Sequence, residues 1–365
     1  MERESFMSGR PGPGRHGSGE HVLIVTALAF ALTGCMDATG FDRSTDVNDL
    51  RILAMRLDPP EVELPLDEDA PPVTVEITAL LANPLDEAVT WEMTACGVPG
   101  SRGCGAWVAE PGTHAEALSR TESGATELPP SGHAPEALIV VQRELTSELM
   151  VELFESASLM GLGGARPAFE IEVEAGEHGE RAFKRLQLSL PDIAYRMALH
   201  EAGIPICDED GLPEGCLPYR TRVPNTNPGI DEVYYRRTSL EGPEAEKEPV
   251  PDYGPLPVAP GEELTFVPRA AGGSAESYQT LSVDFDDHSV WVEDRTELLI
   301  WSWFATAGDF GRPRTEEDRT RGEFNVWTAP SEKPGSEGDV WVWLVLRDNR
   351  GGADFTTLHL RVDDP

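Results

Sequence analysis

After residue 50 the chain consists of short apolar segments separated by turns that contain Gly or Pro. In Val73–Ile77, apolar and polar residues alternate strictly, which is the period of a strand with one face on a core. The segments Phe169–Ala175 and Trp341–Arg347 are each followed by a Gly-containing turn and a further apolar segment. Such pairs are typical of β-hairpins, so the pattern predicts an all-β fold.

Two sets of positions in the first half recur in the second half with the same spacing. They are Trp91, Thr94 and Ala95 with Trp303, Thr306 and Ala307, and Phe183, Leu186, Leu188 and Leu190 with Phe355, Leu358, Leu360 and Val362. Both halves also open with a strand, Leu50–Leu57 or Ile230–Arg237, and a Pro-containing stretch before the next strand. Matching positions at both ends of each half indicate a tandem duplication.

The order of short strands, with a tryptophan in an early central strand, resembles that of immunoglobulin-like sandwiches. The second half is similar to PKD and cadherin-like surface modules in Phe324–Pro330, Val340–Arg347 and the turn Asp348–Gly352. The resemblance implies two tandem immunoglobulin-like β-sandwiches at residues 50–191 and 228–365, joined by a Pro-rich connector at 192–227. It implies a fold but carries no function.

The first half contains about 40 more residues than the second between its matched tryptophan and its closing strand. Thr146 or Ser147 is placed to cap a helix within this insertion. Its apolar stripe consists of Leu149, Met150, Leu153, Phe154, Ala157 and Met160, and Gly161, Gly163 and Gly164 would end it. We expect this helical insertion to cover an open end of the core, and a partner-binding protrusion is the alternative.

The N-terminal region has the features of an export signal. The apolar run Val22–Leu32 is too short for a stable membrane-spanning helix and has the length of a signal-peptide core. Arg3, Arg10 and Arg15 supply the positive flank before it. The run ends in Leu32-Thr33-Gly34-Cys35, which resembles the lipobox of bacterial lipoproteins.

This resemblance implies removal of residues 1–34 and acylation of Cys35, which would anchor the protein to a membrane. Residues 35–49 are polar and are expected to form a flexible tether. Met36 stands where an aspartate would favour retention at the inner membrane, although Asp37 follows one place later. We therefore expect a lipid-anchored protein of the cell envelope, at the outer membrane, on its periplasmic face or at the cell surface.

Four further cysteines follow the anchor: Cys96, Cys104, Cys207 and Cys216. Four cysteines allow three pairings, and their close spacing favours two local loops. An oxidising envelope favours disulfides, each contributing roughly 2.5 kcal/mol. A zinc site is the competing interpretation, but CxxC spacing and nearby histidines are absent from the sequence.

The chain is strongly acidic, with a formal net charge of -36. Such a surface repels nucleic acid and anionic headgroups, so neither is an expected partner. The acidity suits solubility, and calcium binding is the alternative. Three acidic groups are candidates for calcium: Asp208, Glu209 and Asp210; Asp284, Asp286 and Asp287; and Asp348, Asn349 and Asp354. None completes an EF-hand and turn residues of this type usually serve backbone geometry, so we assign no metal or cofactor.

The sequence offers no catalytic apparatus. The histidines after the signal, His114, His133, His178, His200, His288 and His359, are scattered, and neither an HExxH nor a Gly-x-Ser-x-Gly motif is present. We therefore predict that the protein is not an enzyme.

Six tryptophans, Trp291, Trp301, Trp303, Trp327, Trp341 and Trp343, concentrate in the second half. They are expected to fill a sandwich core, and exposed rings would be a binding surface for sugar or peptide. The leading hypothesis is a non-catalytic, lipid-anchored envelope protein that binds an envelope protein or acts as a spacer. The alternative is a glycan-binding or adhesive surface lipoprotein, stabilised by calcium.

Overall fold

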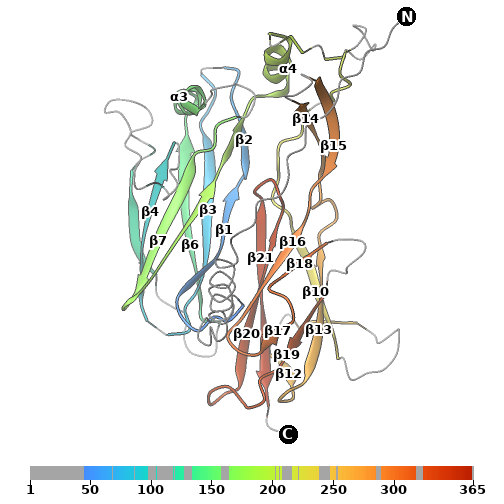
Figure 1. Ribbon diagram of the computed structural model, residues 1–365. Helices are drawn as coiled ribbons and strands as arrows, with labels where there is room; N and C mark the ends of the chain where they lie inside the picture. Colours follow the sequence, from blue (N-terminus) through green and yellow to red (C-terminus); the bar gives the residue numbers. More distant parts are fainter. Residues whose placement is uncertain are drawn as a thin grey trace, which may run out of the picture. The chain divides into compact units, whose positions relative to one another are not determined.

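The computed structural model shows a mostly β fold, and the part of the chain that it describes contains two short helices (Figure 1). It describes residues 45–67, 69–85, 87–97, 104, 118, 120–126, 134–157, 164–201, 203–204, 206–207, 216–220, 222–237, 247–251, 254–284, 289–317 and 324–363. The signal peptide, Cys35 and most of the tether therefore lie outside the described residues.

Strands from the first half form two antiparallel sheets and a short parallel pair, which we call the first sandwich. One sheet has the order β1 (Arg51–Asp58), β3 (Val73–Ala82), β6 (Glu136–Leu145). The other has the order β5 (Glu122–Thr126), β4 (Val89–Cys96), β7 (Ala168–Ala175), β8 (His178–Arg185). The parallel pair is β2 (Glu61–Glu63) with β9 (Gln187–Ser189).

Strands from the second half form two five-stranded sheets, which we call the second sandwich. One has the order β11 (Glu248–Pro249), β10 (Ile230–Arg237), β13 (Glu263–Ala270), β19 (Asn325–Thr328), β17 (Asp309–Phe310). The other has the order β12 (Leu256–Val258), β21 (Ala353–Val362), β20 (Asp339–Arg347), β16 (Ile300–Ala305), β18 (Arg314–Glu316). A separate hairpin, β14 (Ser277–Asp284) with β15 (Ser289–Thr296), is inserted between β13 and β16.

The matched positions of the two halves occupy equivalent places in the two sandwiches. Trp91 on β4 pairs with β7, and Trp303 on β16 pairs with β20; β7 and β20 each continue through a hairpin into a closing strand. Leu188 and Leu360 each pair in parallel with a short early strand, β2 or β12. The internal repeat is thus a repeat of topology, and the expected all-β sandwich fold is confirmed.

The two cores have different compositions. The first sandwich is filled almost entirely by aliphatic side chains, with Phe169 as its fully buried aromatic ring. The second is built around Trp301, Trp303, Trp327 and Phe266, all fully buried. Large rings bury more apolar area per residue, so few of them suffice to fill a sandwich of short strands.

Helix α3 (Ser147–Ala157) begins where the sequence predicts. The Thr146 hydroxyl oxygen accepts a hydrogen bond from the Leu149 amide at 3.3 Å, which satisfies an orphan donor of the first turn. Leu149, Met150 and Leu153 are buried against the first core, so the helix covers that core as expected. Of the glycines predicted to end it, Gly164 is described, with φ of 70°; Gly161, Gly163 and Met160 are not among the described residues.

The segment predicted as a Pro-rich connector contains a second helix, α4 (Asp192–Glu201). It starts directly after Pro191, and Tyr195 and Leu199, four residues apart, share its buried face. These two side chains form a small cluster with Tyr219, against which Leu281 and Val292 of the β14–β15 hairpin pack. Figure 1 shows α4 beside that hairpin. No helix in the described part of the chain is both long and apolar enough to cross a membrane.

Candidate functional site: the junction and cleft between the sandwiches

An apolar contact joins the two sandwiches. Trp343 of β20 is fully buried, but it lies outside the second core and packs in a cluster with Leu53, Ala54, Leu80 and Ala82 of β1 and β3. Its indole Nε1 donates a hydrogen bond of 2.6 Å to Glu136 Oε2 on β6. A tryptophan buried between sheets of both sandwiches removes a large apolar area from water and fixes one face against the other.

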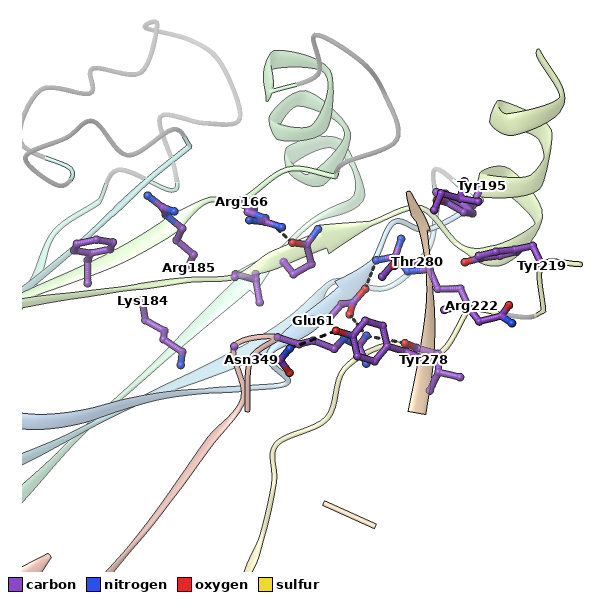
Figure 2. Close-up of a pocket in the computed structure, with 18 residues that line it drawn as sticks. Glu61, Arg166, Lys184, Arg185, Tyr195, Tyr219, Arg222, Tyr278, Thr280 and Asn349 are labelled. Atoms are coloured by element: carbon purple, nitrogen blue, oxygen red, sulfur yellow. Dashed lines mark hydrogen bonds and ion pairs between the residues drawn. The ribbon is translucent and has the colours of Figure 1, made fainter. Parts of the chain in front are cut away.

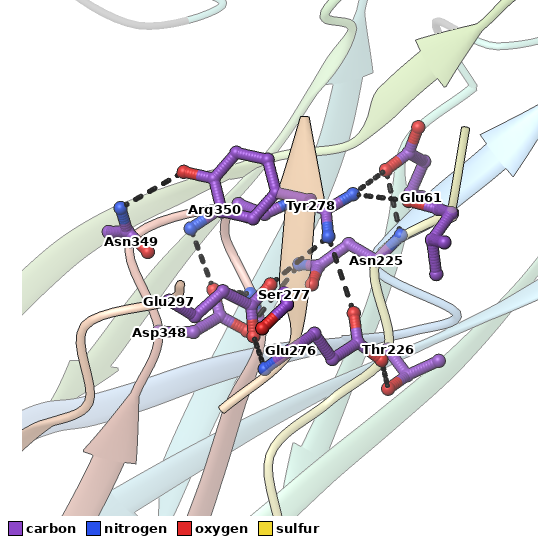
Figure 3. A network of polar contacts seen from close by, with 12 residues as sticks. Glu61, Asn225, Thr226, Glu276, Ser277, Tyr278, Glu297, Asp348, Asn349 and Arg350 are labelled. Carbon is purple, nitrogen blue, oxygen red and sulfur yellow. Dashed lines mark hydrogen bonds and ion pairs between the residues drawn. The ribbon is translucent and has the colours of Figure 1, made fainter. Parts of the chain in front are cut away.

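Arg350, in the turn between β20 and β21, is the centre of a polar network beside this contact (Figure 3). Its Nη2 lies 3.0 Å from Glu61 Oε2 of the first sandwich and donates to the Val223 carbonyl at 2.8 Å. Its Nη1 lies 3.3 Å from Glu276 Oε2 and 3.2 Å from Glu297 Oε1, which flank the β14–β15 hairpin. One guanidinium therefore ties together the first sandwich, the connector and the inserted hairpin.

The turn that carries Arg350 is itself shaped by Asp348. One carboxylate oxygen, Oδ1, accepts hydrogen bonds from the amides of Arg350, Gly351 and Gly352 at 2.6–2.8 Å. Gly351 adopts φ of 115°, a conformation that favours glycine. This local geometry holds the turn Asp348–Gly352 in a conformation from which the Arg350 side chain reaches its partners.

Burial has a measurable effect on the carboxylates of this network. The Glu297 side chain is fully buried, and desolvation raises its pKa from the usual 4.5 to about 7; the Glu276 amide and Arg350 oppose this rise and the Asp348 and Glu276 carboxylates add to it. Glu61, 2% exposed, accepts from Arg222 at 2.6 Å and from the Asn225 amide at 2.8 Å in addition to Arg350. Removal of Arg350 would leave the buried Glu297 carboxylate without its cation, whereas Glu61 would keep Arg222.

A cleft of about 720 Å³ opens above this network (Figure 2). Its walls come from β2, the β8–β9 segment, α4 with the connector, β14, and the turn after β20. Five cationic side chains and one carboxylate, Glu61, line it; the cations are Arg166, Lys184, Arg185, Arg222 and Arg350. This local excess of positive charge stands against the -36 of the whole chain.

The cations of the cleft fall into two groups. Arg222 and Arg350 are paired with Glu61. Arg166 donates to the neutral Gln187 amide oxygen at 2.8 Å, and Arg185 lies 5.6 Å from the centre of the Phe183 ring. No described carboxylate forms an ion pair with Arg166, Lys184 or Arg185.

Lys184 shows the effect of this uncompensated charge. It is half-buried at the edge of the first sandwich. Burial, together with the neighbouring Arg347 guanidinium, lowers the pKa of the Lys184 ammonium to about 8, while the Asp348 carboxylate opposes that change. A positive group that is desolvated beside another positive group is stabilised by an approaching anion.

The four cysteines predicted to form disulfides are paired locally, as their spacing favours. Cys96 is bonded to Cys104 at the end of β4, and Cys207 to Cys216 in the connector. Neither bridge is among the residues that line the cleft. Two disulfides are typical of a protein that resides outside the reducing cytoplasm.

The acidic groups considered for calcium are used otherwise where the structure describes them. Asp348 organises its turn, Asn349 Oδ1 accepts from the Leu298 amide at 3.1 Å, and Asp354 accepts from the Ile230 amide at 2.9 Å. Asp286, Asp287 and the Asp208–Asp210 group lie outside the described residues. Among described residues, no cluster of three or more His, Cys, Asp or Glu side chains has a metal-binding arrangement.

The tryptophans divide between packing and exposure. Trp301, Trp303 and Trp327 fill the second core, whereas Trp343 belongs to the junction. Trp341 is stacked on His359 with ring centres 3.9 Å apart, and His359 also lies 2.9 Å from Asp339. His359 is thus held between the Trp341 ring and the Asp339 carboxylate. Trp291, 44% exposed, is the described tryptophan most open to solvent.

The cleft itself was not predicted from the sequence. Its residues come from seven separate stretches of the chain, and none forms a motif with its chain neighbours. The one available signal is weak: Lys184 and Arg185 form a basic pair at the end of a predicted strand in a chain with few lysines.

Comparisons with known proteins give only remote structural similarity. No known family model matches this chain, and no curated protein matches it. The chain is similar to a red sea bream transglutaminase structure (TM-score 0.21, 7% identity, 87% of this chain, 32% of that chain). It is also similar to a biofilm associated protein BSP domain (TM-score 0.24, 9% identity, 89% of this chain, 62% of that chain). A third similarity is to a partial N-terminal region of an enterococcal surface protein (TM-score 0.20, 6% identity, 90% of this chain, 97% of that chain). The chain thus spans about a third of the transglutaminase, and TM-scores of this size establish neither family nor function.

Proposed function

We propose that this chain is a non-catalytic protein of the bacterial cell envelope, anchored by lipid on Cys35, that binds a protein partner or spaces another component from the membrane. The observation that carries the proposal is the junction: Trp343 and Arg350 each contact both sandwiches from within a largely desolvated interface. Two sandwiches joined in this way act as one rigid unit rather than as independent domains on a flexible linker.

Three further features support this function. Both disulfides suit an oxidising compartment. The described histidines, His178, His200 and His359, lie on three separate elements, β8, α4 and β21, and do not form a catalytic group. The lipobox-like Leu32–Cys35 sequence supplies an anchor at the end opposite the second sandwich in the chain.

Fractionation of the producing cells tests the anchor. The wild-type protein should sediment with membranes, and mass spectrometry should find Cys35 acylated as the first residue. A Cys35→Ser protein should lose firm attachment, because lipid chains bind at about 0.8 kcal/mol per buried CH₂. Retention of Cys35→Ser in the membrane fraction would contradict the anchor.

Affinity purification of the anchored protein from its own envelope, after cross-linking, tests the second part of the proposal. If a partner is recovered with the wild-type protein but not with a variant whose junction between the sandwiches is loosened, the rigid junction is needed for partner binding. The absence of any stable partner would contradict partner binding and leave the spacer function.

A glycan-binding function is the second candidate. It finds less support from the second sandwich than the sequence suggested, because four of its six tryptophans are fully buried. Exposed aromatic side chains occur instead near the cleft, where Phe183 is 50% exposed and Tyr278 lines the wall.

A further inference from the structure

The cleft between the sandwiches concentrates positive charge in an otherwise acidic protein. Of its six charged lining residues, only Glu61 is negative, and Glu61 is fully engaged by Arg222, Arg350 and the Asn225 amide. The charge of Arg166, Lys184 and Arg185 is therefore not balanced by any described carboxylate in contact with it. Like charges held together without a counter-charge destabilise a fold, so their collection here points to a ligand.

The uncompensated cations are held in place by neutral groups. The Arg166 Nε is fixed by the Gln187 side chain at 2.8 Å, and the Arg185 guanidinium lies over Phe183. Figure 2 shows Arg166 and Arg185 on one side of the β8–β9 segment and Lys184 on the other, where it points toward the turn that contains Asn349. A side chain that is oriented but not neutralised can hydrogen-bond an incoming oxyanion with little loss of conformational entropy.

The remaining wall suits an organic ligand. Tyr278 carries Arg350 over its ring at 4.7 Å and receives a hydrogen bond from Asn349 Nδ2 at 3.4 Å. Phe183 offers an exposed apolar ring, and Gln279, Thr280 and Asn349 offer neutral hydrogen-bonding groups. The volume of about 720 Å³ lies within the range of about 300–1,000 Å³ that small-molecule sites occupy.

We propose that this cleft binds a small organic anion whose carboxylate or phosphate oxygens accept hydrogen bonds from Arg166 and Arg185, with Phe183 and Tyr278 against its less polar side. This binding function goes beyond the spacer function and does not depend on it.

Calorimetric titration of the full chain with three matched sugars tests the proposal: glucose, glucuronate and glucose 6-phosphate. These probes share a ring and differ in a neutral, carboxylate or phosphate group. At least one of the anions should bind while glucose does not, and the tighter of the two identifies the preferred oxyanion. Binding should weaken with added salt, because the attraction is electrostatic.

Variants assign the binding to this cleft. The double variant Arg166→Gln, Arg185→Gln should weaken the anion by about tenfold for each cation removed, the usual effect of a lost charge-assisted hydrogen bond. Arg236→Gln is the matched control, because Arg236 also lies over a phenylalanine ring, Phe324 at 5.8 Å, but does not line the cleft.

Thermal melting of each variant establishes that it is folded, so that loss of binding is attributable to the missing cation. Failure of both anions to bind the wild type overturns the proposal. So does equal binding of glucose, or an affinity of the double variant equal to that of the control. None of these results bears on membrane attachment, which is tested separately through Cys35.

Discussion

The two sandwiches share one strand order but differ in how each is filled and in what is inserted. At the matched positions, Trp303 is fully buried and donates from Nε1 to Thr315 Oγ1 at 3.0 Å, whereas Trp91 is only partly buried. The Trp91 ring instead covers Gly124 of β5, where an added Cβ would lie 2.7 Å from the ring. The matched tryptophan therefore lies in the centre of the core in the second sandwich, whereas in the first it covers the edge strand β5.

The insertions differ in a way that bears on function. The first sandwich carries α3, which caps its own core. The second carries the β14–β15 hairpin, which packs on α4 and is flanked by Glu276 and Glu297, two partners of Arg350. The two sandwiches thus share their central strand pairing, and the second carries an inserted hairpin that flanks two partners of Arg350 and forms part of the cleft wall.

Replacement of the two matched tryptophans should give the largest effect and the sharpest difference. Trp303→Ala should lower the free energy of unfolding by about 3–5 kcal/mol, since it leaves a cavity in a fully packed core. Trp91→Ala should cost about 1–2 kcal/mol, because its ring is partly solvated. Urea unfolding followed by circular dichroism measures both losses. Equal losses would contradict the different structural roles of the two tryptophans.

Removal of the Arg350 side chain should be next in size. Arg350→Ala leaves Glu297 buried without its cation and leaves Glu61 paired with Arg222 alone, which should lower the free energy of unfolding by about 3 kcal/mol. The loosened junction should also increase the maximum dimension of the protein in small-angle scattering.

The matched control for Arg350 is Arg269→Ala, since Arg269 also lies over a tyrosine ring, Tyr234 at 5.3 Å, but outside the junction. Its loss should change stability by less than about 1 kcal/mol. If the two variants lose the same stability and scatter alike, the junction is not held by Arg350.

The smallest expected effect is a pH dependence of the free energy of unfolding, which arises from Glu297 at the end of the β14–β15 hairpin. Because the folded pKa of Glu297 is about 7 and its usual value is 4.5, the folded protein retains a proton that the unfolded chain has released between these values. The free energy of unfolding should therefore fall as pH rises from about 4.5 to about 7. Arg350, Glu276 and Asp348 are the charged groups that face Glu297 in this range.

Glu297→Gln should remove this part of the pH dependence, so that the variant gains on the order of 2 kcal/mol relative to wild type across the window; solvent screening makes this less than the full product of the shift and about 1.4 kcal/mol per pKa unit. Glu316→Gln, at an exposed position of β18, is the control and should follow the wild-type curve. Denaturant melts at pH 4.5, 6 and 8 measure the difference; parallel curves for all three proteins would contradict a raised Glu297 pKa.

Local chemistry was predictable to a large extent. The hairpins after Phe169–Ala175 and Trp341–Arg347, the helix capped by Thr146 and the local disulfides each depend on residues close in sequence. Helix α4 was missed because the connector is rich in proline and its helical pattern consists of two residues only, Tyr195 and Leu199. Their burial depends on Tyr219, which is distant in the sequence. The β14–β15 hairpin was missed because it has no counterpart in the first half.

The sequence by itself determined the alternation of apolar and polar residues in the strands, the hairpins, the N-cap of helix α3 and the internal repeat. These features depend on backbone geometry and on neighbours within a few residues. Only the tertiary structure decided that Trp343 leaves its own core, that Arg350 meets Glu61 across 289 residues of chain, and that Arg166, Lys184 and Arg185 share one cleft. The physical reason is that the strength of a charged contact depends on the water removed around it, and both sandwiches must be in place before that water is gone.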